Sequence, residues 1–393
     1  MSASQQQLAD LDSAIQRHQT YLEADPENFH LYFKLAELYH NASRFDEAIS
    51  AYEKSASLGA DKNVVRSRIA SILISLHRFE EASIRFQQLI NEGENDPVLF
   101  YNLGLCLFYM REFEKARSWI EKAEANGVDP RMCFNYRTQC LHHEGKMAEA
   151  VDSCKEWLSM EDTSQVRGYL SLVELDNGNT AEAKRIAQQV LTEEPDNEEA
   201  EFVMGTAAMD TQEMDEAEAY FKRILGRHTN HARANFGMGL VHLYRQQHQQ
   251  AIKAMNQAIK LDPKNTGMWL ALGWTHATAL DLRGAERTFR ETIKVDPNFA
   301  EGYGGLAYAL AALQRVDEAK EAIKKATWLD PACFGAAAAQ SLLAGVEGDE
   351  ERSKRMLAAM LEHKPSEDIP SLLEHIQTYL TKQHGSGKPP VKH

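Results

Sequence analysis

The sequence has few cysteines, and their arrangement argues against two common structural roles. The five cysteines are Cys106, Cys133, Cys140, Cys154 and Cys333, an odd number without CxxC spacing. Neither a disulfide framework nor a cysteine-based metal site is expected from such a set. We therefore predict reduced, mostly packed thiols, as is typical of a protein of the cytoplasm.

Basic residues are fewer than acidic ones, and long apolar runs are missing. The chain has 43 Lys and Arg against 58 Asp and Glu, a net charge of −15, and no basic stripe stands out in the sequence. This balance argues against nucleic acid as the main partner. No stretch is long and apolar enough to cross a bilayer, so we expect no membrane insertion. The first residues, MSASQQQLADLDSAIQ, have neither a basic region nor a continuous apolar segment, so we expect no signal peptide.

Recognisable catalytic and cofactor motifs are also missing. The sequence contains no HExxH, GxSxG, GxGxxG or CxxC. His228 and His231 lie in the polar stretch RHTNH, typical of a solvated loop, and the adjacent His142 and His143 point to different faces of a helix. We therefore predict no catalytic residue, no metal site and no cofactor, and we do not expect an enzyme.

The dominant feature of the sequence is an alanine that recurs every 34 residues, with a single step of 33. These ladder alanines are Ala14, Ala48, Ala82, Ala116, Ala150, Ala183, Ala217, Ala251, Ala285 and Ala319, and Ser353 continues the series. A fixed period of this length indicates a stack of repeats, each too small to bury its apolar face alone.

One unit of the series, TGMWLALGWTHATALDLRGAERTFRETIKVDP, shows what the alanine does. Trp269, Leu272 and Gly273 share one face of a first helix, while Ala285 and Phe289 share one face of a second. The small residues let the two helices approach closely, and Phe289 fills the space beside them. The Asp-Pro pair then ends the second helix, because the residue before proline is pushed out of the helical region. Each repeat is thus predicted to be a helix hairpin.

These motifs resemble the tetratricopeptide repeat family. The resemblance rests on sets such as Phe100, Leu103, Gly104, Ala116; Trp269, Leu272, Gly273, Ala285, Phe289; and Tyr303, Leu306, Ala307, Ala319. It covers nearly the whole chain and implies an all-α fold, a right-handed α-solenoid or superhelix of tandem helix hairpins.

The register predicts the following division of the chain: a capping helix or half repeat at 1–28, repeats one to four at 29–163, repeats five to nine at 164–333, a degenerate tenth repeat at 334–367, a capping helix at 368–383 and a disordered tail at 384–393. The 33-residue step falls near residue 160, where no proline closes the repeat, and indicates a local change in superhelical pitch or a hinge. Repeat four also carries Arg137 and Thr138 where other repeats have a Leu-Gly pair.

The resemblance further implies that first-helix positions line a concave surface. Charged residues are scarce at these positions, and the large apolar residues there are our predicted partner-binding set: Phe236, Leu240, Leu270, Trp274 and Tyr308, with Tyr101, Leu105 and Phe108 as a second station. The lysine and asparagine set that clamps chaperone tails in some members is not assembled. Two interpretations stay open, namely packing between successive first helices or an apolar groove for an amphipathic helix or extended segment of a protein partner.

Gly302, Gly304 and Gly305 in one predicted helix need a reason, since glycine is unfavourable in helices by roughly 1 kcal/mol. Close packing of neighbouring helices is one reason, and room for a partner between Trp274 and Tyr308 is the other. The predicted function is a non-catalytic protein-binding scaffold or adaptor. A cytoplasmic chaperone for hydrophobic secreted or membrane-destined proteins and a structural subunit of a larger assembly are the alternatives.

Overall fold

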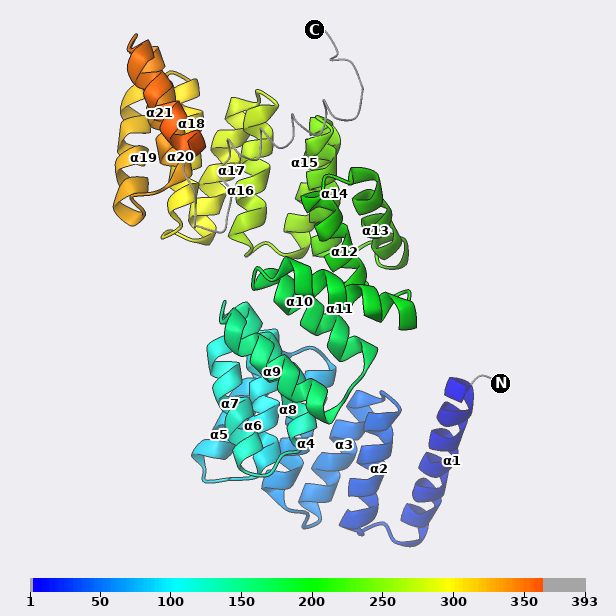
Figure 1. The fold of residues 1–393 in the computed structure, drawn as a ribbon. Coiled ribbons are helices and arrows are strands. Elements are labelled where there is room, and N and C mark those ends of the chain that lie inside the picture. Colours follow the sequence, from blue (N-terminus) through cyan, green and yellow to red (C-terminus); the bar gives the residue numbers. More distant parts are fainter. Residues whose placement is uncertain (1–2, 363–393) are drawn as a thin grey trace. The chain divides into compact units, whose positions relative to one another are not determined.

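The computed structural model describes residues 3–362, and these residues form helices joined by short turns, without any strand. The chain divides into two compact units, one ending at Ala200 and the other beginning at Glu201. Within each unit, consecutive helices lie side by side as hairpins (Figure 1). This confirms the predicted all-α solenoid of tandem hairpins.

Unit 1 comprises α1 (Ala3–Ala24), α2 (Phe29–Asn41), α3 (Phe45–Ser57), α4 (Lys62–Ser75), α5 (Phe79–Asn91), α6 (Pro97–Tyr109), α7 (Phe113–Ala125), α8 (Pro130–His143), α9 (Met147–Met160), α10 (Ser164–Asp176) and α11 (Thr180–Glu193). The division between the units falls within α12 (Glu198–Asp210). Unit 2 continues with α13 (Met214–Arg227), α14 (Ala232–Tyr244), α15 (His248–Leu261), α16 (Thr266–Thr278), α17 (Leu282–Val295), α18 (Ala300–Ala312), α19 (Val316–Leu329), α20 (Phe334–Val346) and α21 (Glu350–Glu362).

The predicted capping helix at 368–383 and the predicted tail at 384–393 lie outside the described residues. At the other end, α1 packs against α2, and Gln19 donates a hydrogen bond to the Tyr39 hydroxyl over 2.9 Å. Near residue 160, α9 packs against α10 within unit 1. A change of pitch or a hinge at that join stays a prediction.

The turn inside each hairpin has one residue in the left-handed backbone region. It recurs in the same register as the ladder alanines, and the residues are Ser43, His77, Arg111, Gly145, Gly178, Gln212, Gln246, Leu280, Gln314 and Gly348. Its non-glycine members have φ between 56° and 65°. Some second helices are followed by another left-handed glycine, as at Gly59, and others end at an extended residue, such as Asp296 before proline or His228. Both ends turn the chain into the next repeat.

The ladder alanines lie where the two helices of a hairpin meet. The nine from Ala48 to Ala319 are all 0% exposed, and the residue four positions later is a large fully buried side chain in several repeats, such as Phe221, Met255 and Phe289. The Phe289 ring lies between Gly273 of α16 and Gly305 of α18, where added Cβ atoms would come within 2.4 and 2.3 Å of it. One aromatic ring of the second helix therefore holds two successive first helices together.

The three glycines of α18 are explained by packing on both sides of the helix. Gly305 faces Phe289, and Gly302 faces Thr292 and Ile293, all of α17. Gly304 faces α20, where an added Cβ would lie 2.7 Å from the backbone nitrogen of Ala336. The close approach of the α18 and α20 backbones therefore favours helix packing as the reason for these glycines. Gly304 lies in close helix packing and leaves no room for a partner.

Repeat four adds a polar network to its apolar core. Arg137 pairs with Glu124 at 2.9 Å and with Glu156 at 2.6 Å, and its guanidinium stacks on the Phe134 ring at 4.7 Å. The hydroxyls of Thr138 and Ser153, both buried, are 2.7 Å apart. These contacts supply partners for polar groups that would otherwise be costly to bury.

We expect Ala217→Leu to destabilise the protein by about 1–3 kcal/mol, because the side chain at position 217 is fully buried beside Phe221 and added volume must distort that contact. Ser353→Leu in α21 should cost less, because Ser353 is only half-buried. Thermal unfolding of the two variants measures the difference. Equal shifts in the melting temperature would show that the ladder position does not set the packing.

A second matched pair tests the glycines of α18. Gly305→Ala should lower the urea midpoint, because its methyl group would come within 2.3 Å of the Phe289 ring, which Gly273 confines from the other side. Gly302→Ala should be close to neutral or stabilising. Its methyl group meets side chains at 3.3 Å, and alanine is better in a helix by roughly 1 kcal/mol. A Gly305→Ala variant as stable as Gly302→Ala would contradict this account of the packing.

Candidate functional site

The predicted binding residues of unit 2 lie on first helices and are all half-buried. Trp274 of α16 and Tyr308 of α18 pack on each other, with ring centroids 5.1 Å apart, and Trp274 also contacts the buried Phe289 ring at 5.5 Å. Leu270 packs against the same core. Three of the five predicted residues are therefore brought together, and the space between Trp274 and Tyr308 is filled by their own contact.

Phe236 and Leu240 of α14 belong to a different part of the core. They pack around Met255 and Leu272. Their half-buried side chains lie on the first helix of the preceding repeat. Trp274, in contrast, packs on the neighbouring core with Leu270 and Tyr308.

The structure adds Phe334 to the set, a residue that sequence reasoning missed. Phe334 begins α20, is 42% exposed, and lies 6.2 Å from Trp274 by ring centroids. We call Trp274, Tyr308 and Phe334 the aromatic cluster. The sequence does show an aromatic residue directly before Gly335, at the start of the degenerate repeat. Its position in the repeat does not by itself predict that it contacts Trp274.

Glu301 of α18 caps the N-terminus of α20, the helix that begins at Phe334. Its carboxylate accepts hydrogen bonds from the backbone N–H groups of Phe334, at 2.7 Å, and Gly335, at 3.0 Å. A carboxylate at a helix N-terminus satisfies unpaired donors and interacts well with the helix dipole. Glu301, one of the few charged residues at the predicted concave positions, thus caps the first helix of the next repeat.

The second predicted station, in unit 1, is more deeply packed. Tyr101 is buried, and its hydroxyl donates a hydrogen bond to the Met132 carbonyl over 3.2 Å. Phe108 is half-buried and contacts Tyr136 of α8 at 5.1 Å, while Leu105 packs in the same core. Tyr101 therefore joins α6 to α8, and only Phe108 and Leu105 retain partly exposed surface.

His142 and the five cysteines are buried. His142 is buried, with Nδ1 2.9 Å from the Tyr169 hydroxyl and Nε2 2.7 Å from the Asp176 carboxylate. All five cysteines are buried and unpaired. Burial raises the pKa of Cys106 to about 12 and that of Cys133 to about 11, so these thiols are protonated at neutral pH.

Between residues 3 and 362, no group of three or more His, Cys, Asp or Glu side chains is placed to hold a metal ion. Over the same range, none of the helices has the length and apolar character needed to cross a membrane.

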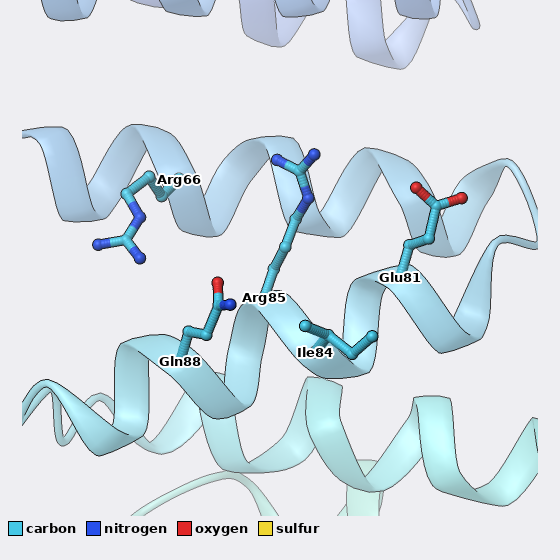
Figure 2. Close-up of a pocket in the computed structure, with 5 residues that line it drawn as sticks. All are labelled: Arg66, Glu81, Ile84, Arg85 and Gln88. Atoms are coloured by element: carbon cyan, nitrogen blue, oxygen red, sulfur yellow. The ribbon is translucent and has the colours of Figure 1, made fainter.

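Two open pockets, each lined mainly by residues of a second helix, have charged linings. In unit 1, a pocket of about 300 Å³ is lined by Arg66, Glu81, Ile84, Arg85 and Gln88. Figure 2 shows Arg85 extending from α5 towards α4, the helix that carries Arg66. In unit 2, a pocket of about 460 Å³ is lined by Arg283, Glu286, Arg287, Arg290, Leu313 and Arg315. Four arginines at one pocket are a local basic surface that the sequence analysis did not find.

Several solved structures resemble the chain. A monomeric mutant of IFIT1 with Gppp-AAAA is 13% identical and covers 84% of this chain and 89% of its own, with a TM-score of 0.51, which bears on the fold alone. MamA is 25% identical over 40% of this chain and 92% of its own, with a TM-score of 0.36. Yeast Tom70 is 15% identical over 96% and 92%, with a TM-score of 0.41. A search of curated proteins gives no match.

Family models of the tetratricopeptide repeat match residues 4–63, 174–235, 232–265 and 270–332, which together make up more than half of the chain. Repeats of this kind are protein-interaction modules, so in general terms the protein is an interaction scaffold. The chain belongs to the tetratricopeptide repeat family.

Proposed function

We propose that the protein is a non-catalytic scaffold that binds an apolar segment of a partner protein on the first helices of unit 2. The observation that carries this proposal is the aromatic cluster, in which three successive first helices each contribute one partly exposed ring. Large aromatic residues in contact with one another are the common anchors of protein interfaces. The bound segment is an amphipathic helix or an extended strand with apolar side chains.

The exposure of Phe334 favours a role of the aromatic cluster in partner binding over a role in core packing alone. A ring whose only role is to fill the core would be buried like Phe289, which is 0% exposed, whereas Phe334 is 42% exposed. Trp274 links that exposed ring to the core, since it contacts both Phe334 and Phe289. The cluster therefore offers apolar surface on a rigid support.

The proposed compartment is the cytoplasm. Five free, buried cysteines are consistent with a reducing environment. The net charge of −15 would help to keep a complex with an apolar segment in solution.

The test starts from peptides selected for binding to the full chain from a phage-displayed library, followed by titration with purified variants. Phe334→Ala and Trp274→Ala should each weaken the selected amphipathic peptides by roughly 30-fold, the loss expected from a hot spot of about 2 kcal/mol. Trp328→Ala is the matched control, because Trp328 is a 73% exposed aromatic residue of the same unit on a second helix, α19. It should leave binding unchanged.

Trp274→Ala removes core contact as well as exposed surface, so each variant must retain its helical circular dichroism and a melting temperature well above the assay temperature. Phe334→Ala is the decisive change, because its ring is the more exposed. The proposal fails if selected peptides bind the folded Phe334→Ala and Trp274→Ala proteins as tightly as they bind the Trp328→Ala protein.

A further inference from the structure

A second surface of unit 2, on α17, has a chemistry opposite to that of the aromatic cluster. Arg283, Arg287 and Arg290 lie at successive turns of this helix and are exposed. The other face of α17 carries the buried Ala285 and Phe289. The arginines therefore line the solvent side of a second helix.

Arg315, at the N-terminus of α19, completes the pocket of about 460 Å³, which Leu313 and Glu286 also line. Glu286 is the only acidic residue of this lining. Four guanidinium groups thus share this lining with Glu286, and Arg315 also pairs with Glu318 at 2.6 Å just beside it. The lining itself is basic, although the chain as a whole has a net charge of −15.

Glu286 is already neutralised by two of the four arginines. Its Oε1 accepts hydrogen bonds from Arg290 at 2.9 Å and from Arg315 at 2.8 Å. Burial alone would raise the pKa of Glu286, but these hydrogen bonds outweigh it and hold that pKa below its ordinary value. Glu286 thereby shows that the pocket accommodates a carboxylate between guanidinium groups.

Two arginines of the pocket, Arg283 and Arg287, are not paired with a carboxylate of the described residues. Across residues 3–362, neither Arg283 nor Arg287 forms an ion pair with a carboxylate. The nearby Asp281 is engaged elsewhere: it accepts a hydrogen bond from the Gly284 N–H at 2.9 Å and contacts His276 at 2.9 Å. Asp281 also interacts electrostatically with Arg287, but in the described part of the chain no carboxylate pairs directly with Arg283 or Arg287. Both guanidinium groups can therefore bind an incoming anion.

We propose that this arginine pocket, defined by Arg283, Arg287, Arg290 and Arg315, binds an acidic segment of a protein partner through its aspartate or glutamate side chains. Guanidinium groups bind carboxylates through paired hydrogen bonds. Residues four apart on a helix are about 5–6 Å apart at Cβ, close to the spacing of alternate side chains in an extended peptide. Arg283 and Arg287 therefore match two carboxylates of one extended segment.

Nucleic acid is the less suitable occupant. Its single strands are usually held by stacking on aromatic side chains, and the pocket lining contains none. A long duplex would also place further phosphates against a chain with an excess of acidic residues. The site goes beyond the proposed function, because it lies on α17 and α19 and uses no residue of the aromatic cluster.

The test measures binding of a fluorescently labelled hexaglutamate peptide to the full chain by anisotropy, at low and at physiological ionic strength. The wild type should bind with micromolar to submillimolar affinity at low ionic strength and more weakly as salt screens the charges. The double variant Arg283→Gln, Arg287→Gln should weaken binding by about tenfold or more. The charge reversal Arg287→Glu should abolish it.

The matched control is Arg352→Gln, Arg355→Gln on α21, which removes the same two positive charges from exposed positions of the same unit. It should leave peptide binding within about twofold of the wild type, since its effect is only a screened long-range one. Equal losses in both double variants would show non-specific attraction and overturn the proposal. So would undetectable binding at low ionic strength, or tighter pocket-dependent binding of an oligothymidylate of equal charge.

Loss of the aromatic cluster by Phe334→Ala should leave hexaglutamate binding unchanged, so the two proposals can fail independently.

Discussion

The contact between a ladder alanine and the neighbouring first helix sets the geometry on which the rest of each unit depends. Ala285 is 0% exposed, and the adjacent Phe289 ring is confined between Gly273 and Gly305. Because interiors are packed as tightly as organic crystals, a small residue and a large one must alternate at this contact. The same arrangement recurs in α13, where Phe221 lies between Gly205 and Gly237. Repetition of one packing unit thus produces the stack.

In repeat four, polar contacts accompany the apolar core. Arg137 with Glu124, and Thr138 with Ser153, hold repeat four together through ion pairs and a buried hydroxyl pair. Such contacts depend on geometry more strongly than apolar packing does, because a buried polar group that loses its partner is costly. The repeat nearest the 33-residue step therefore depends in part on directional polar contacts.

The hairpins and their register were predictable from the sequence because they follow from side-chain size at a fixed period. Ala285, Gly273 and Phe289 could be assigned to one contact from spacing alone. The polar network of Arg137 was not predictable, since its partners Glu124 and Glu156 lie on other helices and no period relates them. Phe334 was missed for a similar reason: its proximity to Trp274 depends on the unusually close approach of α18 and α20.

The net charge of the whole chain gives no sign of the arginine pocket. A net charge of −15 averages over the whole chain, whereas a binding site depends on charges within a screening length of about 8–10 Å. Arg283, Arg287 and Arg290 are separated by acidic or apolar residues along the sequence, and only the helical period brings them to one face. Arg315 joins them from the next repeat, which the sequence order does not reveal.

The two proposed sites differ in how much side-chain freedom is lost when a partner binds. Trp274 and Tyr308 are already immobilised by contact with each other and with Phe289, so a partner that covers them loses little side-chain entropy. Arg283 and Arg287 are exposed and must be ordered by their ligand. The aromatic cluster is therefore suited to provide most of the affinity for a partner, and the arginine pocket to provide selectivity and faster association through charge.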